Sequence, residues 1–382
     1  MRYRLDEIVD VTMGQSPKSE YYNTEKNGYP FLQGNRTFGF KYPTFDTYTT
    51  VVTKFAKAGD VIMSVRAPVG ALNITPVDMC LGRGVCALRM KNGNQSFLFY
   101  MMKNYVSHLL KRESGTVFGS VNRNDINDLG VDIPEDLEEQ KRIARYLEMI
   151  DDKIELNNAI NNNLEQQMQT IFNKFISEKA IISKTSVENV VLTANTGADA
   201  IQKAPIVDYD TGIRCVRVGD MTNNRSFYDW GYTKVTEEVF NRYQLHKNDI
   251  IVTRTASLGL NMIISEDLQA VYNNGLIRLS INDKKVLPLF IYRQFQTDDF
   301  TNYISRIESE TSVRPNMKIS YLLKYEFVLP SLNEQNKLID SLQPMIEQQS
   351  SLVNENNVLK SLRDILLPKL MSGELDISDI DL

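Results

Sequence analysis

The stretch "PEDLEEQKRIARYLEMIDDKI" (Pro134–Ile154) decides the fold, because the chain repeats it later as "PSLNEQNKLIDSLQPMIEQQ" (Pro330–Gln349). Superposing Glu139 on Glu334 aligns the two copies at an offset of 195 residues, in a chain of 382. Each copy follows a long block of quite different sequence. The chain therefore consists of a block, a repeat, a second block and a second repeat.

Both copies carry the heptad pattern of a coiled coil. In the first copy, apolar residues predominate at positions spaced alternately by four and three: Ile143, Leu147, Ile150, Ile154, Asn157, Asn161, Leu164, Met168, Ile171 and Phe175. The corresponding positions of the second copy are Leu338, Leu342, Met345, Gln349, Leu352, Asn356, Leu359, Arg363, Leu366 and Leu370. This spacing predicts two long helices, each with an apolar seam that packs against a partner helix.

The sequence also predicts where the two helices begin and whether they are continuous. Asp136 stands three residues before Glu139, and Ser331 stands three before Glu334, which is the spacing of an N-terminal capping box. The first copy contains no glycine or proline over most of its length, so we expect an unbroken helix. Pro344 lies inside the second helix, where proline removes a backbone hydrogen bond, so we expect a kink or a break there.

Asparagines occupy three seam positions. Asn157, Asn161 and Asn356 are candidates for buried polar contacts that fix the register of the helix pair at some cost in stability. The alternative is that they face water, as we expect for Asn162 and Asn163, which lie off the seam.

The order of the segments predicts how the helices run. The first helix leads away from the first block, so a second helix that pairs with it must return, and the pair is antiparallel. We therefore expect an α+β protein in which two similar domains are separated by an antiparallel pair of long coiled-coil helices, related by a pseudo-two-fold axis.

The two blocks share a skeleton in spite of their divergence. Short runs rich in β-branched and aromatic residues, cut by Gly, Asn and Pro, predict strands and turns in both. Helices are expected at residues 95–112 and 287–307. The parallel runs are "AGDVIMSVRAPVGALNI" with "KNDIIVTRTASLGLNMI", "RGVCALRM" with "NGLIRLSI", "FLQGN" with "VRVGD", and "SGTVFGSVNRNDI" with "SETSVRPNMKI".

Composition and charge limit the function. The net charge of −5 is unevenly spread: residues 1–133 carry +4 and residues 177–329 carry zero, whereas the repeats 134–176 and 330–382 carry −4 and −5. An anionic partner can therefore meet the blocks without meeting the acidic repeats. Three cysteines without a Cys-x-x-Cys pair favour a reducing compartment over disulfides or a zinc site. We expect no membrane span and no export signal.

Polar loops of the blocks carry side chains suited to DNA. Arg, Asn and Gln can each make two hydrogen bonds to a base edge, and Lys and Arg neutralise phosphates. For any single loop the alternative is a solvated surface loop. In the first block the candidate DNA contacts are Lys18, Gln33, Asn35, Arg36, Lys41, Arg66, Arg83, Thr116, Ser120, Asn122 and Arg123. In the second block they are Arg217, Asn223, Asn224, Arg225, Arg254, Asn273, Asn274, Thr311, Arg314, Asn316 and Lys318.

These features together resemble the specificity (S) subunits of type I restriction–modification systems. The resemblance spans nearly the whole chain and rests on an ordered set of motifs. These are "GQSPKSEYYNTEKNGYPFLQGN" near the front, "SVRAPVG", the proline followed by "EEQKRI", its echo "PSLNEQNKLI", and the tail "LLPKLMSGEL".

The resemblance implies a function for each segment. Residues 1–133 and 179–329 are then target recognition domains that each read one half of a split site in double-stranded DNA. Residues 134–178 form the first spacer helix, and residues 330–382 form the second spacer helix and the C-terminal tail. The partners are two methyltransferase subunits and ATP-dependent restriction subunits, in the cytoplasm.

The resemblance also implies a subunit with no catalytic site, cofactor or metal of its own. The sequence agrees, since it has no phosphate-binding Gly-x-x-x-x-Gly-Lys-Ser/Thr motif and no Pro-Pro pair of an amino-methyltransferase signature. Two alternatives remain open from the residues alone: a coiled-coil scaffold that joins proteins without reading DNA, and a standalone DNA methyltransferase or nuclease.

Overall fold

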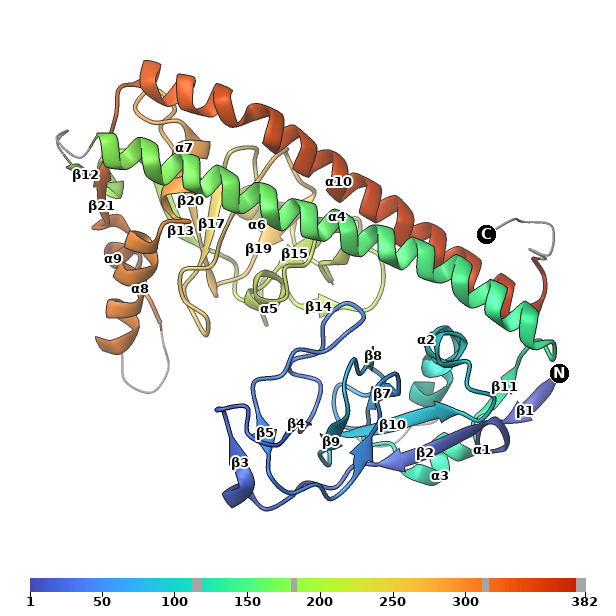
Figure 1. Cartoon of the computed structure of the whole chain (residues 1–382). Coiled ribbons are helices and arrows are strands. Elements are labelled where there is room, and N and C mark those ends of the chain that lie inside the picture. The colour runs from blue at the N-terminus through green and yellow to red at the C-terminus, as the bar shows by residue number, and fades with distance from the viewer. Residues whose placement is uncertain (112–118, 180–183, 311–315, 376–382) are drawn as a thin grey trace. The chain divides into compact units, whose positions relative to one another are not determined.

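The protein is described by a computed structural model over residues 1–111, 119–179, 184–310 and 316–375 (Figure 1). Contacts divide it into two compact units, Met1–Ile160 with Ser351–Leu382, and Asn161–Ser350. The boundary falls within two long helices, α4 (Leu137–Glu178) and α10 (Leu332–Ser372). Each unit therefore holds one sheet-rich block and part of both helices.

The first unit is built on an antiparallel four-stranded sheet in the order β2-β10-β7-β8. Helix α2 (Gln95–Lys111) packs on this sheet and confirms the helix expected at 95–112 as far as residue 111. The same core takes in Ile143 and Leu147 of α4 and Leu370 of α10, so the block and the helices are buried together. The sheet strands are β2 (Val9–Met13), β7 (Val61–Ser64), β8 (Leu72–Ile74) and β10 (Val85–Met90).

A second, five-stranded sheet of the first unit has the order β3-β5-β4-β9-β6, and a strand pair β1–β11 joins the start of the block to its end. Two short helices, α1 (Leu5–Ile8) and α3 (Arg123–Asn127), complete the unit. The remaining strands are β1 (Arg2–Arg4), β3 (Tyr22–Asn23), β4 (Tyr29–Leu32), β5 (Tyr48–Thr49), β6 (Phe55–Ala56), β9 (Met79–Leu81) and β11 (Gly130–Asp132).

The second unit repeats this topology. Its antiparallel sheet has the order β13-β20-β17-β18, its smaller sheet the order β14-β16-β15-β19, and β12 pairs with β21. The strands are β12 (Lys184–Ser186), β13 (Val191–Thr196), β14 (Ile206–Val207), β15 (Arg214–Val216), β16 (Tyr232–Thr233), β17 (Ile250–Thr253), β18 (Asn261–Ile263), β19 (Ala270–Tyr272), β20 (Leu276–Ile281) and β21 (Glu326–Val328). The skeleton predicted to be common to both blocks is thus confirmed.

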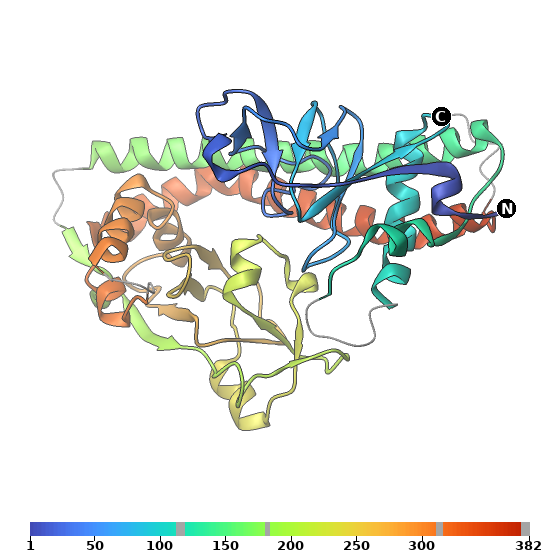
Figure 2. The same cartoon turned by 90° about the horizontal axis from the view of Figure 1, so that it is seen from below.

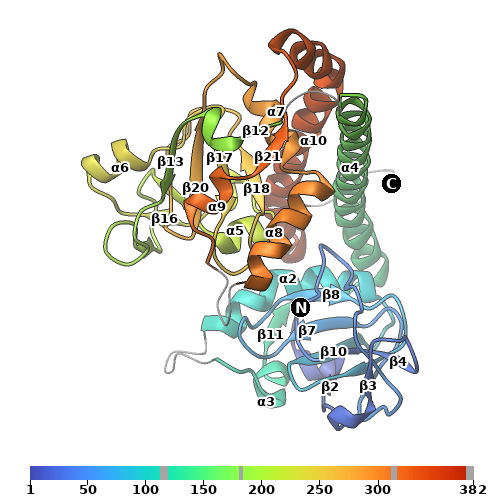
Figure 3. The same ribbon diagram turned by 90° about the vertical axis from the view of Figure 1, so that its left-hand side faces the viewer.

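Helices of the second unit differ in one respect from the prediction. The single helix expected at 287–307 is two helices, because the Thr297 hydroxyl accepts the Phe300 N–H and begins a new one. Residues of these helices share a core with the sheet and with the second unit's parts of α4 and α10 (Figure 3). The helices are α5 (Val218–Thr222), α6 (Glu237–Tyr243), α7 (Pro288–Gln294), α8 (Asp298–Glu310) and α9 (Ile319–Leu323).

The structure corrects one detail of the repeat. The pairing of "FLQGN" with "VRVGD" placed Phe31 opposite Val216, but the strand ladders match Leu32 with Val216. In the first unit Leu32 pairs in parallel with Leu81, and in the second Val216 pairs in parallel with Tyr272. Gly34 and Gly219, which that pairing places opposite each other, are therefore not equivalent, and Gly219 lies inside α5.

Within each unit α4 and α10 lie side by side and run in opposite directions (Figures 1 and 2). In the first unit the buried Asn157 donates from Nδ2 to Asn356 Oδ1 at 2.9 Å, and Asn356 donates to Asn158 Oδ1 at 2.9 Å. In the second unit Gln349 donates from Nε2 to the Asn161 carbonyl at 3.0 Å. The prediction that seam asparagines form buried polar contacts is confirmed for Asn157 and Asn356.

Both helix starts are confirmed. The Asp136 carboxylate accepts the Glu139 N–H, and Ser331 and Glu334 cap each other reciprocally. Of the kink or break predicted at Pro344, the break is wrong, since α10 continues through it. Pro344 lies on the exposed side of the helix, where the carbonyl that loses its N–H partner can bind water instead.

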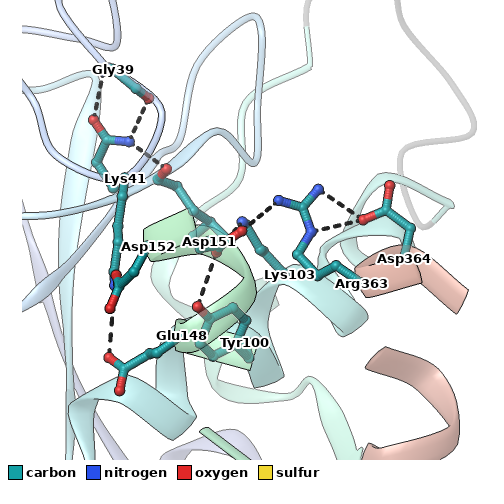
Figure 4. A network of polar contacts seen from close by, with 11 residues as sticks. Gly39, Lys41, Tyr100, Lys103, Glu148, Asp151, Asp152, Arg363 and Asp364 are labelled. Carbon is teal, nitrogen blue, oxygen red and sulfur yellow. Dashed lines mark hydrogen bonds and ion pairs between the residues drawn. The ribbon is translucent and has the colours of Figure 1, made fainter. Parts of the chain in front are cut away.

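A buried polar network joins α2 of the first unit to both long helices (Figure 4). Asp151 of α4 is completely buried, and its carboxylate accepts from Tyr100 Oη at 2.9 Å and from Arg363 Nη1 at 2.8 Å. Lys103 Nζ lies 3.5 Å from the same carboxylate. Burial lowers the pKa of Lys103, and the Asp151 charge opposes that shift. The network fixes how α2, and the sheet beneath it, sit on the helices.

Candidate nucleic-acid interface

Four predicted DNA contacts of the first block converge on one groove. Lys18, Gln33, Arg36 and Arg83 all line a groove of about 750 Å³. Lys18 comes from the loop after β2, Gln33 and Arg36 follow β4, and Arg83 lies in the turn between β9 and β10. Asn35 lies beside them in the chain, between Gly34 and Arg36. Strand ends that are far apart in sequence thus meet at one surface.

The Arg36 side chain is exposed and forms an ion pair within this groove. Its guanidinium lies 2.5 Å from the Asp46 carboxylate, across the same groove. Hydrogen bonds from Arg36 and then from Thr47 lower the pKa of Asp46, so this carboxyl stays ionised at neutral pH. The ion pair is exposed to solvent, where such pairs contribute little to stability, so Arg36 can exchange Asp46 for a phosphate or a base at small cost.

The prediction for Lys41 is corrected. Its side chain is buried, and Nζ lies 3.3 Å from Asp152 and 3.8 Å from Glu148, both on α4. Burial lowers the pKa of this ammonium, but nearby Tyr42, Asp152 and Glu148 outweigh burial and the pKa is raised. Lys41 therefore holds its loop against α4 and is not available to DNA.

A second group of predicted contacts in the first block surrounds an isolated β-bridge. Arg66 pairs with Ser120, and both are exposed. Asn122 caps α3 by accepting the N–H groups of two following residues, and the exposed Arg123 is the first residue of that helix. Thr116 lies outside the described residues.

The second block has an equivalent bridge, between Thr255 and Asn316. Asn316 and Lys318 are both exposed there. Arg254, the neighbour of this bridge, donates to the carbonyls of Met317 and Asn274 at 3.1 Å each. Its guanidinium thus supports the local fold. Thr311 and Arg314 lie outside the described residues.

Other predicted contacts of the second block lie around α5. Arg225 is exposed, and its Nη1 lies 3.2 Å from the buried Asp220. Asn223 and Asn224 follow the helix and are exposed, with Asn224 in the left-handed backbone region. Arg217 precedes α5, is partly buried, and donates from Nη1 to the Cys215 carbonyl at 2.9 Å.

The last two predicted contacts lie in the turn between β19 and β20. Asn273 Oδ1 accepts the Gly275 N–H at 3.2 Å. Asn274 is exposed, and its Nδ2 lies 3.4 Å from Asp199. This turn is the counterpart of the turn that carries Arg83 in the first block.

Two residues that line the groove of the first block, Ser16 and Asp46, were not among the predicted DNA contacts. Ser16 accepts the Arg83 N–H at 3.1 Å and donates to Gln33 Oε1 at 2.9 Å. Ser16 contacts residues 17 and 67 positions away, and Asp46 contacts a residue 10 positions away, so their roles carry no local signal. The only pointer to Ser16 was its place in the "GQSPK" stretch.

The part of the chain that the structure describes gives little support for a metal site, a reactive cysteine or a membrane-spanning helix. That part holds no group of three or more side chains placed to bind a metal ion. All three cysteines are buried, and burial raises the pKa of Cys86 to about 12 and that of Cys215 to about 11, so neither is an activated thiol. None of its helices is long and apolar enough to cross a membrane.

Comparison with known proteins gives a consistent result. The putative type I restriction enzyme MjaX specificity subunit of Methanocaldococcus jannaschii is 36% identical over 176 residues, which is 46% of this chain and 41% of that protein. The type I restriction enzyme EcoBI specificity subunit of Escherichia coli is 21% identical over 412 residues, covering 98% of this chain and 86% of that one.

A solved structure shows the same fold. The S subunit of a type I restriction–modification system from M. genitalium superposes with a TM-score of 0.51 over 99% of this chain and 96% of that chain, at 14% identity. The sequence profile of the type I restriction modification DNA specificity domain matches residues 1–166 and 192–361. This match sets aside a scaffold that does not read DNA. The chain belongs to the family of type I restriction–modification DNA specificity subunits.

Proposed function

We propose that this chain reads a bipartite DNA site, with residues 1–133 reading one half and residues 179–329 the other. Residues 134–178 and 330–382 form the spacer between the two readers. The repeated topology carries this proposal, because β2-β10-β7-β8 and β3-β5-β4-β9 return as β13-β20-β17-β18 and β14-β16-β15-β19. One scaffold that occurs twice with different loops is suited to reading two halves of a DNA site that differ in sequence.

The proposal extends to the partners. The chain docks two methyltransferase subunits and, through the complex, ATP-dependent restriction subunits in the cytoplasm. The chain contributes recognition and no catalysis, so methyl transfer by the purified chain alone would contradict the proposal.

A pull-down with labelled duplex, with and without co-purified methyltransferase, tests whether the chain reads DNA. We expect retention that falls steeply as salt rises, because phosphate contacts release counterions. No retention in either preparation would contradict DNA reading.

Replacing Arg36 or Arg225 by alanine is expected to impair only one half of the site each. Arg36 is an exposed cation in the first block and Arg225 in the second, and each is held by an aspartate of its own block. Loss of a side chain that contacts a base typically weakens binding about tenfold or more. Binding to duplexes with either half scrambled measures this. Equal damage to both halves by either variant would contradict two independent readers.

The first unit also offers a docking surface on α10. Val358, Leu362 and Ile365 are exposed at intervals of four and three, so they form one apolar strip on a helix face. Val358 is 67% exposed and Ile365 60% exposed, which is unusual for apolar residues on a heptad spacing. We propose that a methyltransferase subunit covers this strip.

Replacing Val358 and Ile365 together by glutamate is expected to reduce methyltransferase retention at least tenfold, because the two charges would have to be desolvated at the interface. Size-exclusion chromatography of the mixed subunits measures the effect. Asn357→Glu adds one such charge to α10 at the position next to Val358, which is turned about 100° away from the strip, and is the control. The melting temperature of both variants should stay close to that of the parent. Undiminished complex formation by the double variant would exclude this surface.

A further inference from the structure

The strand ladders place one residue of each block at the same structural position. Gln33 follows directly on Leu32, and Arg217 follows directly on Val216, the two residues that the parallel ladders make equivalent. The next turn is equivalent too: the Gly82 N–H donates to the Leu32 carbonyl at 2.8 Å, and the Asn273 N–H donates to the Val216 carbonyl at 3.2 Å. Gln33 and Arg217 are thus counterparts, although the sequence alone had aligned them with other residues.

The backbone at Gln33 is held rigidly. A Cβ atom added at Gly84 would lie 2.4 Å from the Gln33 carbonyl oxygen, and one at Gly82 would lie 2.7 Å from the Gln33 Cα. The turn between β9 and β10 therefore packs against Gln33 at a distance that only glycine allows. Such close support fixes where the side chain starts, which a base-reading residue requires.

The side-chain amide of Gln33 is also oriented. Because Ser16 Oγ accepts the Arg83 N–H at 3.1 Å, its own proton is free to be donated to Gln33 Oε1, at 2.9 Å. The hydroxyl takes one of the two lone pairs of Oε1 and so orients the amide, which keeps its second lone pair and the N–H donors of Nε2. Gln33 lines the groove that Lys18, Arg36 and Arg83 also line, so this amide is placed among three cations suited to phosphates.

Arg217 can supply donors only, since a guanidinium has no acceptor. Its Nη1 donates to the Cys215 carbonyl, while Nε and Nη2 are buried without a protein partner among the described residues. Unpaired buried donors cost free energy, so turning the side chain outward to a bound acceptor is favoured. Gln33 thus offers N–H donors and one acceptor lone pair, whereas Arg217 offers donors alone.

We propose that Gln33 and Arg217 are the equivalent specificity-determining residues of the two blocks, and that Gln33 selects adenine and Arg217 selects guanine. In the major groove guanine presents two neighbouring acceptors, N7 and O6, whereas adenine pairs its N7 with an N6 donor. The Gln33 amide matches adenine, because Nε2 can donate to N7 and Oε1 can accept from N6, whereas the donors of Arg217 match the two acceptors of guanine. Ser16 is a positioning residue that sets which way the Gln33 amide faces. This inference rests on the proposed function.

The test selects bound duplexes from a randomised pool with the full chain assembled on its methyltransferase. Gln33→Ala is expected to reduce the preference at one base pair of one half about tenfold, and Arg217→Ala at one base pair of the other half. Ser16→Ala leaves the Gln33 amide free to turn over, so the preference for adenine at the Gln33 position should weaken while the rest of the motif is unchanged. Ser19→Ala, in the same groove, is the matched control.

The possible outcomes distinguish failure of this inference from failure of the proposed function. If the parent complex selects no split motif, the proposed function fails. If the parent selects one and Gln33→Ala leaves it unchanged, only the inference fails. A Ser16→Ala variant that binds more weakly at every sequence, with an unchanged preference for adenine, would show a structural role for Ser16 and overturn its positioning role. Melting curves of each variant verify that it is folded.

Discussion

Replacing Arg363 by alanine is expected to lower the free energy of unfolding of the first unit by about 3 kcal/mol or more. Arg363 of α10 pairs with Asp151, whose side chain is completely buried on α4. Burial tends to lower the pKa of Arg363, but the hydrogen bond to Asp151 prevails and raises it. Removing the guanidinium leaves a buried carboxylate whose remaining partners among the described residues are Lys103 and Tyr100 (Figure 4).

A double-mutant cycle in urea denaturation measures this coupling. Asp151→Ala and Arg363→Ala together should cost clearly less than the sum of the two single changes, because the double variant has no stranded carboxylate. Asp364→Ala is the control, since Asp364 also contacts Arg363 but is exposed to solvent. If Arg363→Ala costs less than about 1 kcal/mol, the pair is not what holds α2 and the two helices together.

The long helices could be predicted because their signal is local and periodic. Leu147, Ile154 and Leu342 are completely buried at the predicted seam positions. Toward the end of α4 the agreement fails, since Phe172 is completely buried whereas the predicted Ile171 is only partly buried. A straight helix drifts relative to a repeat of 3.5 residues, and this part of α4 also packs against α7 of the second block.

The candidate DNA contacts could be predicted by residue type but not by surroundings. Lys41 and Arg36 look alike as cations in one polar loop, yet Lys41 is buried against α4 carboxylates and Arg36 is exposed in the groove. The difference arises from contacts with residues more than 100 positions away, as in the Lys41–Asp152 hydrogen bond. The equivalence of Gln33 with Arg217 likewise needed the strand ladders, because neither side chain resembles the other.

Replacing Phe172 by alanine is expected to cost about 3–5 kcal/mol of folding free energy, and to cost it in the second unit. Phe172 is completely buried, and its ring centroid lies 5.2 Å from that of Phe290 on α7. It belongs to a core that also contains Leu338 and Leu342 of α10, so it joins the second block to both helices. A cavity at this place would loosen all of these contacts at once.

The functional consequence should be confined to one half of the DNA site. Since the first unit does not use Phe172, we expect the Phe172→Ala complex to lose preference in the half read by the second block and to keep the other. Selection from a randomised duplex pool at 25 °C, together with urea denaturation, measures both effects. Gln166→Ala, an exposed position on the same helix, should change neither. Loss of preference in both halves at equal strength would show that the two readers depend on one shared core, and the division into two independent units would have to be abandoned.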